Sequence, residues 1–274
     1  MPELPEVQAV CDGLRQKILN RVVQAVQVHE CRLRWPVKID ELSRLITGQE
    51  VVGVRRIAKY IVIQFRNEVS LLIHLGMSGR LGLVDANSSL RKHDHVIFSL
   101  MGEEELRFND PRRFGMVEAV ENSELEEHPR IRNLGVEPFS PEFNAKSFYE
   151  LSRGSKVAIK KFIMDSKRLV GVGNIYASEA LFRAGIHPNT QAGRVGLKRW
   201  EQLVVSIVDV LTKAIKRGGT TIRDFENLDG VAGYFTKELN VYGKDGQPCS
   251  CCERVIRKMR HSARSTYYCP GCQH

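Results

Sequence analysis

The hydrophobic pattern of the first half of the chain combines two helical segments with many short strand-like segments. Apolar side chains recur every three or four positions over 4–20, which predicts an amphipathic helix with Pro5 in its first turn. A shorter helix is predicted over 39–46. Runs rich in Val, Ile, Leu and Phe predict antiparallel strands over 22–28, 51–57, 60–65, 69–75, 80–84, 95–100, 105–108 and 116–120. A helix with such strands favours a β-sandwich or barrel.

The pattern changes at residues 121–144, where Glu, Pro and Asn dominate and the apolar periodicity disappears. This change predicts a domain boundary. Beyond it the pattern predicts helices over 148–151, 157–164, 175–184 and 200–215, and Gly218 and Gly219 end the last of them. Residues 220–239 are polar and glycine-bearing, which predicts a loop. We therefore expect a two-domain α+β protein, with an antiparallel β-sandwich first and a helical domain second.

Charge and composition narrow the kind of partner. The 274 residues include 41 Lys and Arg against 32 Asp and Glu, a net charge of +9. This balance favours a polyanion such as nucleic acid. No apolar run approaches the roughly 18 residues of a membrane span, and the first residues lack the layout of a signal peptide. We expect a cytoplasmic protein.

Five of the seven cysteines are clustered near the C-terminus, which indicates a local metal site and not a disulfide framework. Two Cys-x-x-Cys pairs, separated by sixteen residues, can place four thiolates around one zinc ion: Cys249, Cys252, Cys269 and Cys272. Four thiolates leave no open coordination position, so this zinc would be structural. Cys251 is a competing thiol, although the spacing favours Cys252; His261 and His274 are expected at the surface.

The residues between the two cysteine pairs alternate like a hairpin over 255–259 and 266–268, which predicts a zinc β-ribbon. Five basic residues fall on this ribbon: Arg254, Arg257, Lys258, Arg260 and Arg264. Solvated surface charge would explain them, but on a metal-stiffened hairpin they favour contacts with phosphates.

The first residues could supply a nucleophile. Removal of Met1 would leave Pro2 with a secondary α-amine, and α-amines titrate near pH 8, against about 10.4 for lysine. Such an amine can attack an electrophilic carbon and form an iminium with an aldehyde, with Glu3 beside it to move protons. Taken alone, the same residues also fit a simple lead-in to a helix.

Three further segments suggest nucleic-acid contacts. The turns 74–80 and 109–115 flank Met77 and Phe114 with Gly and Arg, which makes these side chains candidates for insertion into a base stack. The segment 170–176 places glycines before a helix, where backbone amides can approach a phosphate. It lacks the spacing of a dinucleotide site, and the alternative role for Asn174 is that of a helix cap.

The chain resembles, over essentially its whole length, the bacterial formamidopyrimidine-DNA glycosylase family, also called 8-oxoguanine DNA glycosylase or MutM. Six motifs occur in the family's order: the start at residues 2–7, the Lys59 strand, the Met77 turn, 110–115, 171–176 and the four-cysteine finger. The resemblance implies domains over 1–130 (catalytic β-sandwich), 131–240 (helix-two-turn-helix, with a lesion-capping loop at 219–234) and 241–274 (zinc finger).

The resemblance also implies residue roles. Pro2, Glu3 and Lys59 would be catalytic, with Pro2 forming a Schiff base at C1′ of the damaged nucleotide. Met77, Arg112 and Phe114 would fill the void left by the flipped base, with Arg112 facing the orphaned cytosine. The other residues expected to bind DNA or the lesion are Glu6, His74, Lys160, Asn174, Arg223, Tyr242 and Arg264.

The implied activity is excision of 8-oxoguanine opposite C and of formamidopyrimidines from double-stranded DNA, followed by β,δ-elimination. We expect a monomer with one structural zinc and no redox or nucleotide cofactor. Ser166, where the family has Gln or Asn, and Cys251 depart from the pattern. Two other functions remain open: endonuclease VIII-like action on oxidised pyrimidines, and a zinc-finger DNA-binding protein without catalysis.

Overall fold

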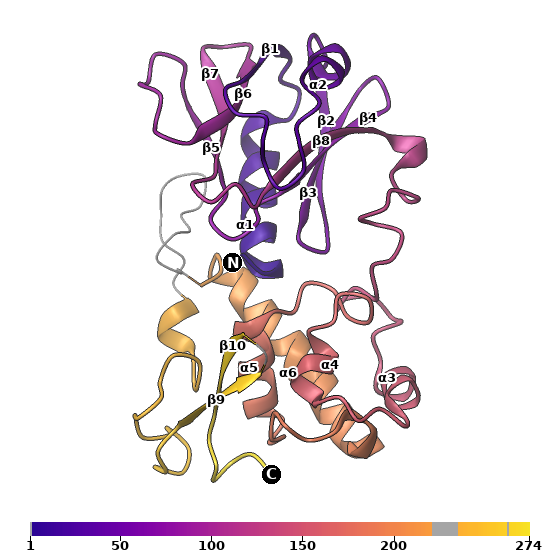
Figure 1. Ribbon diagram of the computed structural model, residues 1–274, viewed down its shortest axis with the longest axis vertical. Helices are drawn as coiled ribbons and strands as arrows, with labels where there is room; N and C mark the ends of the chain where they lie inside the picture. The colour runs from indigo at the N-terminus through magenta and orange to yellow at the C-terminus, as the bar shows by residue number, and fades with distance from the viewer. Residues whose placement is uncertain (1, 221–234, 262) are drawn as a thin grey trace. The chain divides into compact units, whose positions relative to one another are not determined.

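The computed structural model describes residues 2–220, 235–261 and 263–274, which form two compact units (Figure 1). The first unit comprises the described residues of Met1–Arg132 and Arg217–Tyr234, and the second those of Asn133–Lys216 and Phe235–His274. Strands dominate the first unit and helices the second, which confirms the predicted two-domain α+β class. None of the helices in the described ranges is long and apolar enough to cross a membrane.

The first unit contains two four-stranded antiparallel sheets, in the strand orders β1-β6-β7-β5 and β2-β3-β4-β8. The helix predicted over 4–20 is present and ends two residues earlier. The elements are α1 (Leu4–Ile18), β1 (Val23–Val28), α2 (Ile39–Ile46), β2 (Val51–Ile57), β3 (Tyr60–Phe65), β4 (Val69–His74), β5 (Arg80–Asp85), β6 (Asp94–Leu100), β7 (Glu104–Asn109), β8 (Met116–Glu121) and the 3-10 turn η1 (Asn122–Glu124).

Helix α1 shares one hydrophobic core with both sheets. Its inward face buries Val7, Val10, Cys11, Leu14 and Ile18, which follow the helical spacing of the sequence. These side chains pack in the same cluster as residues of β2 and β3 and of β6 and β7. Burial of each large aliphatic side chain contributes about 1.5–3 kcal/mol, so the start of the chain is held by a well-anchored helix.

The second unit packs helices around Trp200. The ring of Trp200 is fully buried, with the rings of Phe148 and Phe162 each 5.8 Å away between centroids. The helix predicted from 148 begins three residues earlier because the Asn144 side chain caps it, accepting the Ser147 amide at 2.9 Å. The elements are α3 (Ala145–Ser152), α4 (Ile159–Ile163), α5 (Asn174–Arg183), η2 (Ala192–Arg194), α6 (Leu197–Lys216), η3 (Phe235–Glu238), β9 (Arg257–His261) and β10 (Arg264–Tyr268).

The finger hairpin β9-β10 is joined to the turn after α5 by the last two residues of the chain. Gln273 is 2 % exposed; its side-chain Oε1 accepts the Cys269 backbone amide at 2.8 Å, and its side-chain Nε2 donates to the Ile186 carbonyl at 2.9 Å. The His274 amide donates to the Gly185 carbonyl at 3.1 Å. The cysteine cluster and the helices are thus tied together within one unit.

Candidate active site and nucleic-acid interface

The start of the chain is fixed by one buried carboxylate. Pro2 and Glu3 precede α1 and are both buried, and Glu6 is fully buried. Oε2 of Glu6 accepts the Glu3 amide at 2.8 Å, as in a capping box. Oε1 accepts both the amide and the hydroxyl of Thr220, each at 2.8 Å. Glu6 therefore holds the residues beside the predicted nucleophile and also binds residue 220.

Gly219 allows this close approach. Its φ is +86°, and a Cβ at this position would lie 2.9 Å from Oε1 of Glu6. A side chain here would meet both backbone strain and the carboxylate. Residues 221–234, which include Arg223 and nearly all of the predicted capping loop, lie outside the described residues, as does Met1.

Lys59 lies in the turn between β2 and β3, close to His74 at the end of β4. The His74 ring lies 4.9 Å from that of Tyr60, and its Nδ1 accepts the Gly76 amide at 3.0 Å. Burial, together with the positive charges of Lys59, Arg34 and Arg130, lowers the pKa of His74 to about 4. His74 is therefore neutral at pH 7, which agrees with Nδ1 acting as an acceptor.

The two arginines near His74 were missed by the sequence analysis. The guanidinium carbon of Arg34 lies 4.7 Å from the centre of the Trp35 ring, and that of Arg130 lies 3.6 Å from it. The adjacent Arg34 and Trp35 are a weak local signal, but Arg130 lies far along the chain. This cluster places cations on an aromatic face beside Lys59 and His74.

The two turns predicted to enter DNA present apolar side chains to solvent. Met77 and Phe114 are each 40 % exposed. The guanidinium carbon of Arg112 lies 4.7 Å from the centre of the Phe114 ring. The Arg112 side chain makes no hydrogen bond or ion pair with any described residue, and its backbone amide donates to Oδ1 of Asp110 at 3.3 Å. Arg113 instead forms an ion pair with Glu30 at 2.8 Å. Of the two consecutive arginines, Arg113 therefore has its guanidinium paired within the described residues and Arg112 does not.

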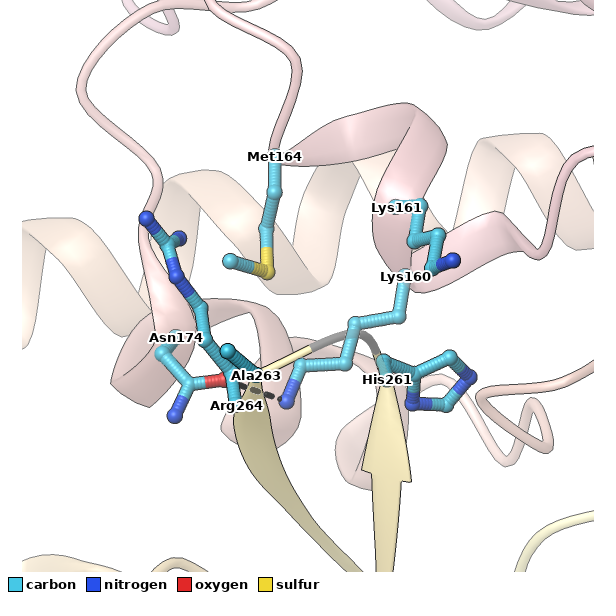
Figure 2. Close-up of a pocket in the computed structure, with 7 residues that line it drawn as sticks. All are labelled: Lys160, Lys161, Met164, Asn174, His261, Ala263 and Arg264. Carbon is cyan, nitrogen blue, oxygen red and sulfur yellow. Dashed lines mark hydrogen bonds between the residues drawn. The ribbon is translucent and has the colours of Figure 1, made fainter.

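The second unit gathers four of the residues predicted to bind DNA or the lesion: Lys160, Asn174, Tyr242 and Arg264. The Lys160 side chain is 1 % exposed, and its ammonium donates to Oδ1 of Asn174 at 2.7 Å and to the Thr266 hydroxyl at 2.9 Å. Nδ2 of Asn174 donates to the Ser265 carbonyl at 2.9 Å and to the Tyr242 hydroxyl at 3.4 Å. A hollow of about 300 Å³ is lined by Lys160, Lys161, Met164, Asn174, His261, Ala263 and Arg264 (Figure 2).

The alternative that Asn174 caps a helix and the expectation that His261 lies at the surface were both wrong. Asn174 does not cap α5, because Gly173 occupies the cap position and the Asn174 side chain bonds to Lys160 and Ser265. His261 is not at the surface: it is 9 % exposed, and its Nδ1 lies 2.8 Å from the Thr266 hydroxyl. Lys160 and His261 both bond to the Thr266 hydroxyl, and His261 lines the hollow, a tertiary arrangement of which the sequence spacing gave no sign. Burial and the charge of Lys160 lower the pKa of His261.

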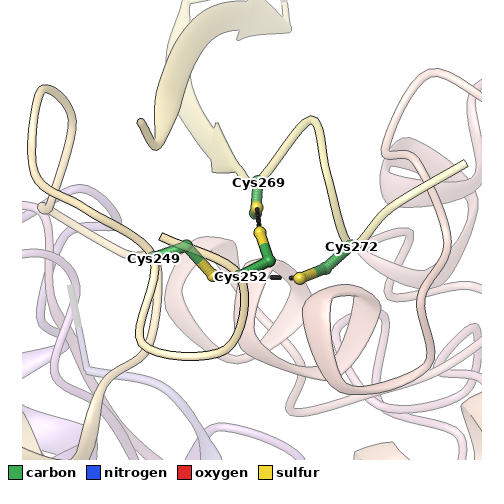
Figure 3. Close-up of side chains that lie close together, drawn as sticks. All are labelled: Cys249, Cys252, Cys269 and Cys272. Carbon is green, nitrogen blue, oxygen red and sulfur yellow. Dashed lines mark hydrogen bonds between the residues drawn. The ribbon is translucent and has the colours of Figure 1, made fainter. Parts of the chain in front are cut away.

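The four predicted zinc ligands lie together (Figure 3). All four sulfurs are within 4.8 Å of one another; Cys249 and Cys272 are 3.8 Å apart, and Cys252 and Cys269 are 3.3 Å apart. Zinc–thiolate bonds of about 2.3 Å in a tetrahedron require sulfurs about 3.8 Å apart, so the cluster fits a zinc ion. Gly271 is needed here because a Cβ would lie 2.8 Å from the Cys252 sulfur.

Cys251 lies outside this cluster. It is exposed, and its backbone amide lies 3.4 Å from the Cys249 sulfur, to which it donates. The side chain of Cys251 is therefore not placed to compete with Cys252.

Comparison with known proteins supports one family. Residues 1–117 match the profile "Formamidopyrimidine-DNA glycosylase N-terminal domain", and residues 134–226 match "Formamidopyrimidine-DNA glycosylase H2TH domain". The chain is 50 % identical over 273 residues to formamidopyrimidine-DNA glycosylase of Alcanivorax borkumensis, with all of both chains covered.

Two solved structures of Lactococcus lactis Fpg are also similar. One is bound to DNA containing N7-benzyl-Fapy-dG (TM-score 0.93, 32 % identity, 100 % of both chains covered). The other is bound to DNA containing an abasic site (TM-score 0.93, 32 % identity, 99 % of both chains covered). The structural similarity to these two proteins covers both units of the chain, including the cysteine cluster. The chain belongs to the formamidopyrimidine-DNA glycosylase family.

Proposed function

We propose that this protein is a bifunctional DNA glycosylase and AP lyase of base excision repair, which removes 8-oxoguanine opposite C and formamidopyrimidines from double-stranded DNA. Membership of the family, the net charge of +9 and the DNA complexes of the L. lactis relatives support this function. The observation that carries the catalytic part is the hydrogen bond from the Glu3 amide to the buried Glu6 carboxylate at 2.8 Å, which fixes the backbone next to Pro2.

In the proposed reaction, the secondary amine of Pro2, exposed by removal of Met1, attacks C1′ of the damaged nucleotide. The bond from C1′ to the base breaks, and the base leaves with a proton. Opening of the sugar gives an iminium between Pro2 and C1′, and Glu3 moves protons during these steps. An α-amine titrating near pH 8 is unprotonated in part at neutral pH, so Pro2 needs no metal to act as a nucleophile.

The iminium makes the proton on C2′ acidic. Its removal expels the 3′ phosphate by β-elimination, and a second elimination expels the 5′ phosphate, so the strand is cut on both sides of the sugar. Lys59, with its positive charge next to His74, is proposed to act near the phosphate and the damaged site. Hydrolysis of the final imine releases Pro2 for another turnover.

The remaining predicted residues are proposed to bind DNA. Met77, Arg112 and Phe114 would enter the stack, since filling the void offsets part of the few kcal/mol that base flipping costs. Lys160, Asn174, Tyr242 and Arg264 would hold phosphates, and His74 would do so as a neutral donor. Arg223 and the loop 219–234 would cover the extruded base.

The three segments 1–130, 131–240 and 241–274 are proposed to serve catalysis, DNA binding and clamping, respectively, in a monomer that works in the cytoplasm. Cys249, Cys252, Cys269 and Cys272 would hold one zinc ion, which stiffens the finger and takes no part in the chemistry, because four thiolates complete its coordination.

Borohydride trapping tests the proposed nucleophile. Processed wild type, mixed with a duplex containing 8-oxoguanine opposite C and reduced with borohydride, should form a covalent protein–DNA adduct, and Pro2→Gly should not. Pro5→Ala is the matched control, because Pro5 lies in the first turn of α1 and its replacement leaves the terminal amine intact. Mass spectrometry of each protein must first show that Met1 is absent.

Wild type that binds the duplex without forming an adduct would instead support a DNA-binding protein without catalysis. A second duplex, containing thymine glycol, separates the remaining alternative. Faster cleavage of thymine glycol than of 8-oxoguanine would place the chain with the endonuclease VIII type of activity.

A further inference from the structure

A single buried carboxylate connects the two turns that carry Met77 and Phe114. Asp110 is fully buried at the end of β7. Its Oδ1 accepts the Ser78 hydroxyl at 2.8 Å, and its Oδ2 accepts the Gly115 amide at 2.7 Å. Charged hydrogen bonds of this length in a buried place are among the stronger ones in proteins. Asp110 therefore bonds to both turns at once.

The backbones of the two turns also touch directly. Gly76 has φ +61°, and a Cβ there would lie 2.5 Å from the carbonyl carbon of Phe114. A Cβ at Gly115 would lie 2.9 Å from the His74 carbonyl oxygen. With no side chain between the turns at either position, a shift of one turn moves the other.

The backbone of Asp110 is also hydrogen-bonded to His93 and His95, which lie outside both turns. Its carbonyl accepts Nε2 of the buried His95 at 2.8 Å, and its amide donates to the His93 carbonyl at 3.1 Å. The same carbonyl accepts the amide of Arg113, whose φ of +55° is unfavourable for a residue with a side chain. Strained conformations of this kind persist where the surroundings over-determine them.

From this geometry we propose that Asp110 and Ser78 are positioning residues that set the place of Met77 relative to Arg112 and Phe114. The hydrogen bond between them decides how strongly the protein prefers a lesion site opposite cytosine. The inference rests on the proposed function, since it assigns Arg112 to the orphaned base. The Arg112 guanidinium makes no polar contact among the described residues, whereas the Arg112 backbone amide donates to Oδ1 of Asp110 at 3.3 Å, so the direction of the side chain depends on the turn that Asp110 holds.

Ser78→Ala tests this role, because it removes the bond between the turns and leaves the carboxylate bonded to Gly115. The matched control is Ser70→Ala: Ser70 is also buried in the first unit, and its hydroxyl donates to Oδ1 of Asn122 at 2.6 Å, away from both turns. Both variants should lose similar thermal stability. Only Ser78→Ala should lose specificity, and Ser78→Thr, which keeps the hydroxyl, should recover it.

The measurement is equilibrium binding to a duplex with an uncleavable tetrahydrofuran site, opposite either cytosine or adenine. The ratio of the two dissociation constants should fall about tenfold in Ser78→Ala, as expected for loss of one buried charged hydrogen bond. The ratio should be unchanged in Ser70→Ala. Fluorescence of 2-aminopurine next to the site should report less complete insertion in Ser78→Ala alone.

An unchanged ratio in Ser78→Ala, or an equal fall in Ser70→Ala, would overturn the positioning role. This readout needs no turnover. If wild type fails to excise 8-oxoguanine while the binding ratio behaves as expected, the proposed chemistry fails and the positioning role stands.

Discussion

The carboxylate of Glu6 accepts two hydrogen bonds from Thr220, which lies 214 positions further along the chain. The remaining oxygen of Glu6 holds the Glu3 amide. A change in the conformation of residues 219–220 should therefore alter, through the Glu6 side chain, the position of Glu3 and of the proposed nucleophile Pro2 next to it.

Gly219→Ala should disturb this contact, and Gly218→Ala provides its control. Both glycines have positive φ, +72° at Gly218 and +86° at Gly219, so both substitutions carry about 1 kcal/mol of backbone cost. Only at Gly219 would the new Cβ meet Glu6, since nothing lies within 4 Å of a Cβ at Gly218. Gly219→Ala should lower the melting temperature further than Gly218→Ala does, and it alone should slow borohydride trapping. Equal effects would mean that the Glu6 contact is unimportant.

The pKa of His74 predicts how stability changes with pH. Its folded-state value of about 4 lies below the ordinary value of 6.5, so the unfolded chain binds more protons between these two values. The contribution of neutral His74 is fully present above pH 6.5 and is lost as the pH falls towards 4. Chemical denaturation should show wild type losing stability relative to His74→Gln within this window, with a constant difference above it. Parallel curves throughout would contradict the lowered pKa.

The cysteine cluster predicts one tightly bound zinc ion per chain. Cys269→Ser should lose the metal and most of the DNA affinity, because the finger's fold depends on four thiolates. Cys251→Ser should keep both, since the Cys251 side chain lies outside the cluster. Metal analysis and a DNA-binding titration check the pair of variants. A Cys269→Ser protein that lacks zinc but binds DNA normally would rule out the clamp role.

Lys160 should contribute one charge to phosphate binding. Lys160→Met should weaken binding to all DNA sequences and reduce the slope of log affinity against log salt by about 1. Lys146→Met is the control, because Lys146 is exposed on α3 in the same unit. The expected result is a changed slope for Lys160→Met only. A slope equal to that of wild type would show that Lys160 serves the fold through Asn174 and Thr266 alone.

Local patterns in the sequence predicted the elements of this fold well. The apolar spacing in α1 and the runs of β-branched residues in β2 and β3 report burial directly, because the periods of helix and strand decide which side chains face the core. The cluster of four cysteines was also predictable from local pattern, because the spacing within each Cys-x-x-Cys pair brings its two sulfurs close together. Element ends were less accurate: α3 begins at Ala145 because of a cap at Asn144 that was not recognised.

Contacts between distant residues could not be predicted in this way. Ser78 and Asp110 are 32 positions apart, and Lys160 and Thr266 are 106 apart. No periodicity relates such pairs; tertiary packing alone brings them together. His261 was misplaced for this reason, since a lone histidine on a basic hairpin gives no sign that a threonine on the neighbouring strand will bond to it. Arg130 was missed for the same reason.

Gln273 and His274 attach the finger to the turn after α5, and this attachment limits which finger sequences the rest of the chain can accept during evolution. A finger cut out at Cys272 would keep all four thiolates but lose the contacts that Gln273 makes with Cys269 and Ile186. A foreign finger, in turn, would have to supply a glutamine at the same distance after its last cysteine. This zinc ribbon is therefore not an interchangeable module: its sequence and that of the turn after α5 are constrained to change together.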